Sequence, residues 1–113
     1  MEVLDTSAFI HEYHSDADAV SIPLVQEELE GEHAYRFDAM EGAGMEIHLP
    51  AEETVDRVRR AAGETGDAGE LSDTDTRLLA AAFELDATLV TDDYAMQNVA
   101  EKLGIDVQVI AHD

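Results

Sequence analysis

Acidic residues stand where the sequence pattern predicts that two strands end. Residues 89–91 read as a short buried strand that runs into Asp92 and Asp93, and the apolar Val3-Leu4 pair runs into Asp5. In an open α/β sheet, ligands bind at the carboxyl ends of the strands. We therefore expect these carboxylates to meet at one edge of a sheet, where they could hold a metal ion.

Glu28 is a third candidate, because it lies on the apolar side of a predicted helix over residues 24–30. At ~100° per residue, its side chain falls between Leu24 and Val25, whereas Glu27 points nearly opposite. A carboxylate on a buried face is costly unless it is paired or bound to metal. The pattern therefore predicts that Glu28 turns inward.

Asp75 is the fourth candidate and lies in the first turn of a predicted helix over residues 72–85, with Ser72 as its N-cap. The helix dipole explains an acid at Asp73. It does not fully explain Asp75, which shares the face of Leu78 and so points toward the core or a cleft.

Together Asp5, Glu28, Asp75 and Asp93 offer only oxygen ligands. Carboxylates held close together either raise one another's pKa values or bind a cation. Mg²⁺ and Mn²⁺ prefer such ligands, and they support phosphoryl transfer and hydrolysis. The alternative is that these acids are helix caps and turn residues that never converge.

Arg57, Arg59 and Arg60 form the only basic cluster of the sequence. They either pair with acids at helical spacing on the same predicted helix or contact a phosphate. His11 and His14 have a spacing that could bind metal, but without a third nitrogen ligand they read as surface residues.

The 113 residues include 27 acids and 6 basic residues, for a formal net charge of −21. The acids are spread along the chain between apolar positions, which is typical of a folded protein that works in molar salt, where charges are screened within ~3 Å. There is no cysteine, no apolar run long enough for a membrane span and no export signal after Met1. We therefore expect a halophilic, cytoplasmic protein with no disulfide and no cysteine-bound zinc.

Predicted strands alternate with predicted helices along one domain, residues 1–113, which favours a right-handed, mainly parallel α/β sheet flanked by helices in three layers. Thr6 or Ser7 is the expected cap of the first helix, and His48 is expected to be solvated. The strands are expected over residues 2–4, 20–22, 45–49, 88–91 and 106–110; the helices over 8–13, 24–30, 51–62, 72–85 and 95–103, with a broken helix over 31–44 and a loop over 63–70.

The sequence resembles the PIN-domain nucleases over about residues 2 to 110. The resemblance rests on Val3-Leu4-Asp5-Thr6-Ser7, Glu28-Leu29, Asp75 before an alanine-rich helix, and Val90-Thr91-Asp92-Asp93. It implies a PIN fold in which Asp5, Glu28, Asp75 and Asp93 bind the divalent ions that cleave RNA. Thr91 matches a hydroxyl residue that supports the site, and the role of Asp92 stays open.

Within that family the sequence is similar to the Nob-type endonucleases, which trim the 3′ end of small-subunit ribosomal RNA precursors. The likeness lies in Ile22-Pro23-Leu24-Val25, in Thr65-Gly66-Asp67 and above all in residues 91–99, Thr-Asp-Asp-Tyr-Ala-Met-Gln-Asn-Val. Nob-type enzymes also carry a zinc ribbon, for which this sequence has no cysteine.

This resemblance implies a divalent-metal-dependent, archaeal endoribonuclease that acts on single-stranded ribosomal RNA precursor within the pre-ribosomal small subunit. One alternative is a toxin-type PIN ribonuclease that acts on tRNA or ribosomal RNA. The other is an inactive PIN scaffold that binds RNA or an assembly protein. The sequence leaves the oligomeric state and the choice between Mg²⁺ and Mn²⁺ open.

Overall fold

Five parallel strands form the centre of the fold, in the spatial order β3-β2-β1-β4-β5. The computed structural model describes residues 1–15 and 17–110. The strands are β1 (Glu2–Leu4), β2 (Ala19–Ser21), β3 (Glu46–Ile47), β4 (Thr88–Thr91) and β5 (Val107–Val109). The helices are α1 (Thr6–Ile10), α2 (Pro23–Glu28), α3 (Gly31–Gly42), α4 (Glu52–Thr65), α5 (Asp73–Leu85) and α6 (Tyr94–Leu103), with a 3-10 turn η1 (Ala68–Glu70).

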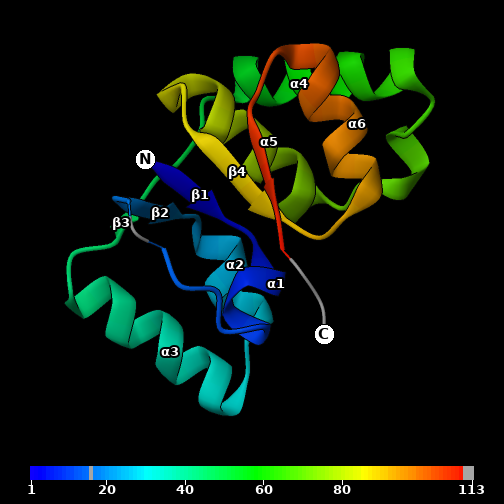
Figure 1. Ribbon diagram of the computed structural model, residues 1–113. Helices are drawn as coiled ribbons and strands as arrows, with labels where there is room; N and C mark the ends of the chain where they lie inside the picture. Colours follow the sequence, from blue (N-terminus) through cyan, green and yellow to red (C-terminus); the bar gives the residue numbers. More distant parts are fainter. Residues whose placement is uncertain (16, 111–113) are drawn as a thin grey trace.

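Helices flank the sheet, as the alternating pattern predicted (Figure 1). Helices α4, α5 and α6 pack on one another, with α5 against β1 and β4. Helices α1 and α3 pack together, and α1 also contacts β1 and β4. The predicted α/β class, with a parallel sheet between helices, is therefore confirmed.

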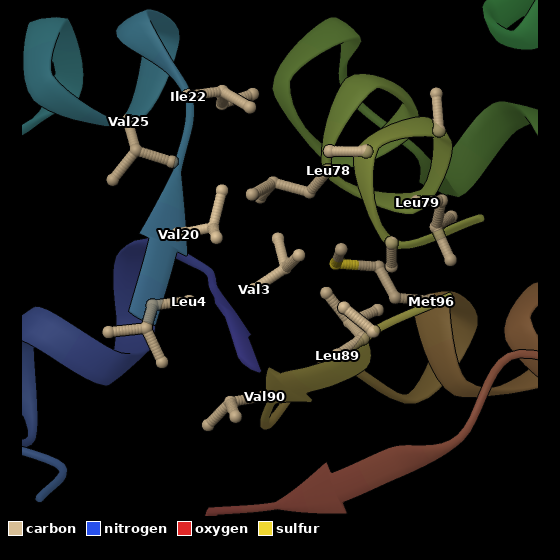
Figure 2. Packing of buried hydrophobic residues seen from close by; sticks show 14 of the residues in the cluster. Val3, Leu4, Val20, Ile22, Val25, Leu78, Leu79, Leu89, Val90 and Met96 are labelled. Carbon is tan, nitrogen blue, oxygen red and sulfur yellow. The ribbon is translucent and has the colours of Figure 1, made fainter. Parts of the chain in front are cut away.

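Both faces of the central strands are buried, because successive side chains of a strand point to opposite faces. Val3 and Leu89 point toward Leu78 and Met96, which come from α5 and α6 (Figure 2). Leu4 lies on the opposite side of its strand, and all of these side chains are essentially inaccessible to solvent. Burial on both sides explains why the central strands read as continuous apolar runs.

Two helices begin earlier than their patterns predicted, because a carboxylate caps each of them. Helix α1 begins at Thr6 and is capped by Asp5, so the expected cap at Thr6 or Ser7 is wrong. Helix α6 begins at Tyr94 and is capped by Asp93. Aspartate is among the best N-cap residues, since its side chain accepts a hydrogen bond from a backbone N–H in the first turn.

The connection between the two halves of the chain also differs from its prediction. Helix α4 continues to Thr65, and η1 occupies part of the expected loop over 63–70. The expected strand over 45–49 is reduced to β3, and His48 is not simply solvated, because its Nε2 lies 2.8 Å from Glu84 Oε1. Across residues 1–15 and 17–110, none of the helices combines the length and apolar character that a membrane span requires.

Glu84, on α5, anchors the segment that joins β3 to α4. Besides the His48 ring, its carboxylate accepts hydrogen bonds from the Ala51 backbone N–H at 3.0 Å and the Thr54 hydroxyl at 2.6 Å. Partial burial raises the pKa of Glu84, but the hydrogen bonds from these three residues outweigh it and leave the pKa below its ordinary value. Ionised Glu84 therefore stabilises the fold.

We predict that Glu84→Gln lowers the free energy of unfolding at pH 7 by about 1 kcal/mol, a value kept small because the site is partly solvated. A lowered pKa gives stability that is present above the ordinary glutamate pKa of about 4.3 and is lost as pH falls through the folded-state value. The difference between Glu84→Gln and wild type should therefore shrink on acidification, as measured by urea unfolding at several pH values. Glu53→Gln, at an exposed position of α4, is the control; an equal loss at every pH would contradict the account.

Candidate functional site

The pairing of β1 with β4 brings two strand ends to the same level of the sheet. Leu4 is paired with Val90, and the Asp5 backbone N–H donates to the Val90 carbonyl at 3.2 Å. Thr91, the last residue of β4, accepts a hydrogen bond from the Asp93 backbone N–H at 3.0 Å. Asp5 and the Thr91–Asp93 turn are therefore neighbours at the carboxyl edge of the sheet.

Asp5 is the most enclosed acid of this edge, with 5% of its surface exposed. Its Oδ1 accepts hydrogen bonds from the Ser7 hydroxyl and from the Ala8 backbone N–H, the latter at 3.1 Å. Burial raises the pKa of Asp5, and hydrogen bonds from Ser7, Thr91 and Ala8 only partly oppose it, while the nearby charge of Asp92 adds to the rise. The ionised form of Asp5 is therefore costly in this fold.

Glu28 reaches the same edge from the end of α2. The Thr6 hydroxyl donates to its Oε1 at 2.8 Å and the Thr74 hydroxyl donates to its Oε2 at 2.7 Å. The expectation that Glu28 is buried on the apolar side of its helix is wrong, because Glu28 is exposed. Helix α2 ends at this residue, and two hydroxyl groups hold its side chain.

Asp75 enters the edge from the first turn of α5 and is half-buried. It forms a reciprocal capping box with Ser72, in which its Oδ2 accepts from the Ser72 backbone N–H at 3.0 Å. Burial raises the pKa of Asp75, hydrogen bonds from Ser72 lower it, and the charges of Asp93 and Glu28 raise it further. The carboxylates of α5, α2 and the β4–α6 turn therefore act on one another electrostatically.

Asp93 and Asp92 differ in their surroundings although they are adjacent. The Oδ1 of Asp93 accepts from the Met96 backbone N–H at 2.9 Å and so caps α6. The Oδ2 of Asp92 lies 3.6 Å from the His11 Nε2, at the end of α1. Asp92 therefore contacts the His11 ring at this edge, whereas Asp93 caps a helix.

The carboxylates lie at one edge of the sheet, but they are not close enough together to bind a single metal ion as they stand. Within residues 1–15 and 17–110, no group of three or more acids or histidines is arranged to hold a metal ion, and this includes His11 and His14. Three of the acids use one oxygen as a helix cap or capping-box acceptor, and no hydrogen bond among the described residues uses Oδ1 of Asp75 or Oδ2 of Asp93. The free oxygens and the raised pKa values of Asp5 and Asp75 suit a hard divalent cation in their chemistry.

Hydroxyl groups hold these acids in place, and the sequence reasoning missed most of them. Thr6 and Thr74 hold Glu28, Ser7 holds Asp5, and Thr91 receives the Asp93 backbone N–H. The available signal was local, since Thr6 and Ser7 directly follow Asp5 and Thr74 directly precedes Asp75. The contact between Thr74 and Glu28 joins residues 46 positions apart and could not be read from spacing.

The structure separates the three arginines of α4. Arg59 forms ion pairs with Asp56 at 3.4 Å and with Asp73 at 3.2 Å. The Arg57 guanidinium lies over the Phe83 ring, 4.8 Å from its centroid. Arg60 lines a pocket between α4 and the end of α6. The ion-pairing interpretation therefore describes Arg59, whereas Arg57 and Arg60 both line the pocket between α4 and α6.

Comparison with known proteins gives concordant matches for this arrangement. A family model described as the PIN domain of ribonuclease matches residues 3–85. The chain is 38% identical over 116 residues to the Endoribonuclease Nob1 of Methanocaldococcus jannaschii, a match that covers 100% of this chain and 58% of that relative. It is 37% identical over 117 residues to the Endoribonuclease Nob1 of Archaeoglobus fulgidus, covering 99% of this chain and 69% of the relative.

Two further matches are more limited. Ribonuclease VapC1 of Thermoplasma acidophilum is 46% identical over 59 residues, which is 52% of this chain and 30% of that protein. Among solved structures, a PilT N-terminus domain protein from Sulfolobus solfataricus P2 superposes with a TM-score of 0.61 over 96% of this chain and 85% of its own, at 20% identity. At that identity the likeness concerns the fold alone.

We predict that Asp5→Asn raises the thermal midpoint at neutral pH by about 4 °C, the shift that ~1 kcal/mol produces in a chain of this size. Asparagine keeps the N-cap and removes a buried charge. A raised carboxyl pKa means that the folded state binds more protons than the unfolded state, so stability falls as pH rises through the folded-state pKa. The advantage of the variant should therefore disappear as pH falls to aspartate's ordinary pKa of about 3.9.

Calorimetry of both proteins across pH would check this, with Asp106→Asn at an exposed position as the control. A lower midpoint for Asp5→Asn at neutral pH would contradict it.

Proposed function

This chain belongs to the PIN-domain ribonuclease family and is Nob1-like within it, and from that premise we propose that it is a divalent-metal-dependent endoribonuclease. The observation that carries the proposal is the backbone hydrogen bond between Asp5 and Val90, which places Asp5 next to the turn that carries Asp93. Glu28 and Asp75 arrive from α2 and α5 at the same edge, where Thr74 links them. A phosphodiester bound at this edge would meet carboxylates from four separate elements.

In this proposal Asp5, Glu28, Asp75 and Asp93 would hold Mg²⁺ or Mn²⁺, with Asp92 beside them. Bound ions of this kind supply charge that activates a water and stabilises the leaving oxygen when a phosphodiester is hydrolysed. Asp5 provides an enclosed anion whose charge a cation would relieve. Hydroxyl groups of Ser7, Thr6 and Thr74 orient the carboxylates of Asp5 and Glu28. Thr91 orients the turn that carries Asp93 by accepting a hydrogen bond from its backbone N–H.

We propose single-stranded ribosomal RNA precursor, at the 3′ end of the small-subunit RNA, as the substrate and the pre-ribosomal small subunit as the setting. Two relatives named Endoribonuclease Nob1, which align with 99% or more of this chain, support this. The run from Thr91 to Val99, with its paired aspartates, carries the same likeness in the sequence. We further propose that the protein works at molar salt, which its net charge of −21 supports, in an archaeal cytoplasm.

A toxin-type ribonuclease is the second candidate. It is supported by the Ribonuclease VapC1 match, which extends over 52% of the chain. An inactive scaffold is less consistent with the site, because all four acids are present and two of them have raised pKa values. The cleavage pattern separates the first two functions, and metal binding separates both from the third.

The deciding experiment is cleavage of an end-labelled RNA that spans the small-subunit 3′ end, in molar KCl with Mn²⁺ or Mg²⁺. We expect one cut near the mature end, loss of cutting with EDTA and at least a hundredfold slower cutting by Asp5→Asn. Cuts spread elsewhere, or confined to tRNA, would favour the toxin-type enzyme. An Asp5→Asn protein that cuts at the wild-type rate would refute the assignment of this site.

Thr74 should act as a positioning residue for Glu28. Thr74→Val removes the hydroxyl that donates to Glu28 Oε2, and losing a hydrogen bond to a charged group, worth ~1.5–3 kcal/mol, should lower kcat about tenfold or more. KM for RNA should change little, because Thr74 is buried away from solvent. Thr74→Ser keeps the hydroxyl and should restore most of kcat; equal losses in the Val and Ser variants would show that only packing matters.

A further inference from the structure

The six basic residues of the chain fall into two groups, although acids outnumber them by 27 to 6. Arg59 and Arg77 each form ion pairs with Asp73 and with a second acid, and Arg36 donates to the Tyr13 carbonyl. Arg57, Arg60 and Lys102 differ, since all three line one pocket. Half of the positive charge of the chain is therefore collected at one place.

This pocket, the α4–α6 pocket, has a volume of about 310 Å³. It is lined by Arg57, Arg60, Ala61, Glu64, Lys102 and Leu103. Lys102 pairs with Glu64 at 3.3 Å, but among the described residues no carboxylate forms an ion pair with Arg57 or Arg60. Three positive groups and one negative group leave the pocket with a formal charge of +2, on a chain whose net charge is −21.

Two arginines without an ion-pair partner among the described residues are unexpected on a protein with 27 acids, because most positions on its surface have a carboxylate nearby. Arg57 is held over Phe83 by its planar face, an arrangement that fixes the guanidinium without neutralising it. The N–H groups of a guanidinium that is fixed in place and has no carboxylate partner can donate hydrogen bonds to phosphate oxygens. The pocket is therefore suited to an anion from outside the chain.

Helix α6 connects this pocket to the acidic edge. It begins next to Asp93 and runs back toward α4 (Figure 1). Tyr94, Asn98 and Lys102 follow one another at four-residue spacing and so lie along one face. Met96, Val99 and Ala100 fill the opposite, buried face. Tyr94 is 76% exposed at the acidic end, and Lys102 lines the pocket at the other.

We propose that the exposed face of α6 and the α4–α6 pocket form a binding track for single-stranded RNA that leads away from the acidic edge. This inference rests on the proposed function, since it takes RNA as the substrate. Tyr94 stacks on a base, Asn98 lies beneath the strand, and Lys102, Arg57 and Arg60 bind a backbone phosphate.

The dimensions fit this proposal. Lys102 follows Tyr94 by eight positions, which is about 12 Å along a helix at 1.5 Å per residue. At ~3.4 Å per stacked nucleotide, three or four nucleotides cover that span. Single-strand binding proteins combine exposed aromatic rings, on which bases stack, with positively charged groups that follow the backbone. An acidic protein partner would use the basic pocket but would have no need of the ring beside the acidic edge.

The test measures binding of a fluorescent single-stranded RNA 12-mer in EDTA, in the Asp5→Asn background, so that cleavage does not interfere. We expect the Arg60→Gln and Lys102→Gln double variant to raise Kd about tenfold or more and to reduce the dependence of binding on salt. Arg59→Gln is the matched control, because it removes the same charge from a neighbouring position of α4 that is already paired. It should change Kd less than twofold.

Two further variants test the track in opposite directions. Glu64→Gln removes the negative charge from the pocket and should lower Kd about threefold, whereas Glu53→Gln on the same helix should not. Tyr94→Ala should raise Kd about tenfold, which is the loss of one stacked base at ~1.4 kcal/mol, and Tyr94→Phe should preserve binding.

Equal effects of Arg59→Gln and Arg60→Gln, or no effect of the double variant, would overturn the track. So would a failure of the Asp5→Asn protein to bind the RNA at all, or binding of a polyglutamate peptide in preference to RNA with the same pocket dependence.

RNA binding and RNA cleavage are measured separately, so the track and the proposed function can fail independently of each other. Wild-type cutting with no effect of the pocket variants refutes the track alone. Pocket-dependent RNA binding by a wild-type protein that never cuts refutes the proposed function alone.

Discussion

The parallel pairing of β1 with β4 is the constraint on which the site depends. The hydrogen bond from the Asp5 N–H to the Val90 carbonyl fixes where the two strands stop relative to each other. A slip of one residue would turn every β1 side chain to the opposite face, so that Val3 would lose its packing against Leu78 and Met96 (Figure 2) and Asp5 would shift relative to the end of β4. The apolar packing of Val3 and Leu89 therefore secures the position of Asp5, which lies two residues after Val3.

The acids at this edge serve local structure and chemistry at the same time. Asp5 and Asp93 begin α1 and α6, and Asp75 completes the capping box of α5. Capping consumes one oxygen of each carboxylate and fixes the direction of the other. The interpretation as helix caps and the interpretation as a converging site, which the sequence presents as alternatives, are thus compatible. Burial is the main cause of the raised pKa values of Asp5 and Asp75; hydrogen bonds from hydroxyl and backbone groups oppose that rise only in part, and neighbouring acids add to it.

The sequence predicts those features that depend on short-range pattern. The apolar runs before Asp5 and Asp92 predict buried parallel strands, and their ends follow directly. Features that depend on distant neighbours are not predictable in this way: the division of the α4 arginines is decided by Asp73 and Phe83 on α5. The exposure of Glu28 follows from the shortness of α2, which a helical wheel assumes to be continuous. Helix α1 begins early because Asp5 caps it, whereas the pattern favours a cap at Thr6 or Ser7.

The double use of Asp5 and Asp93 limits how this domain can change over evolutionary time. A substitution to alanine at either position removes the chemical group and the helix cap together, whereas asparagine or serine removes the charge and keeps a capping oxygen. A lineage that abandons catalysis but retains the fold should therefore accumulate asparagine or serine at these two positions. Glu28 caps no helix, so its replacement need not retain a capping oxygen. The residues that replace these acids in related proteins would then show which acids cap a helix in addition to any role in catalysis.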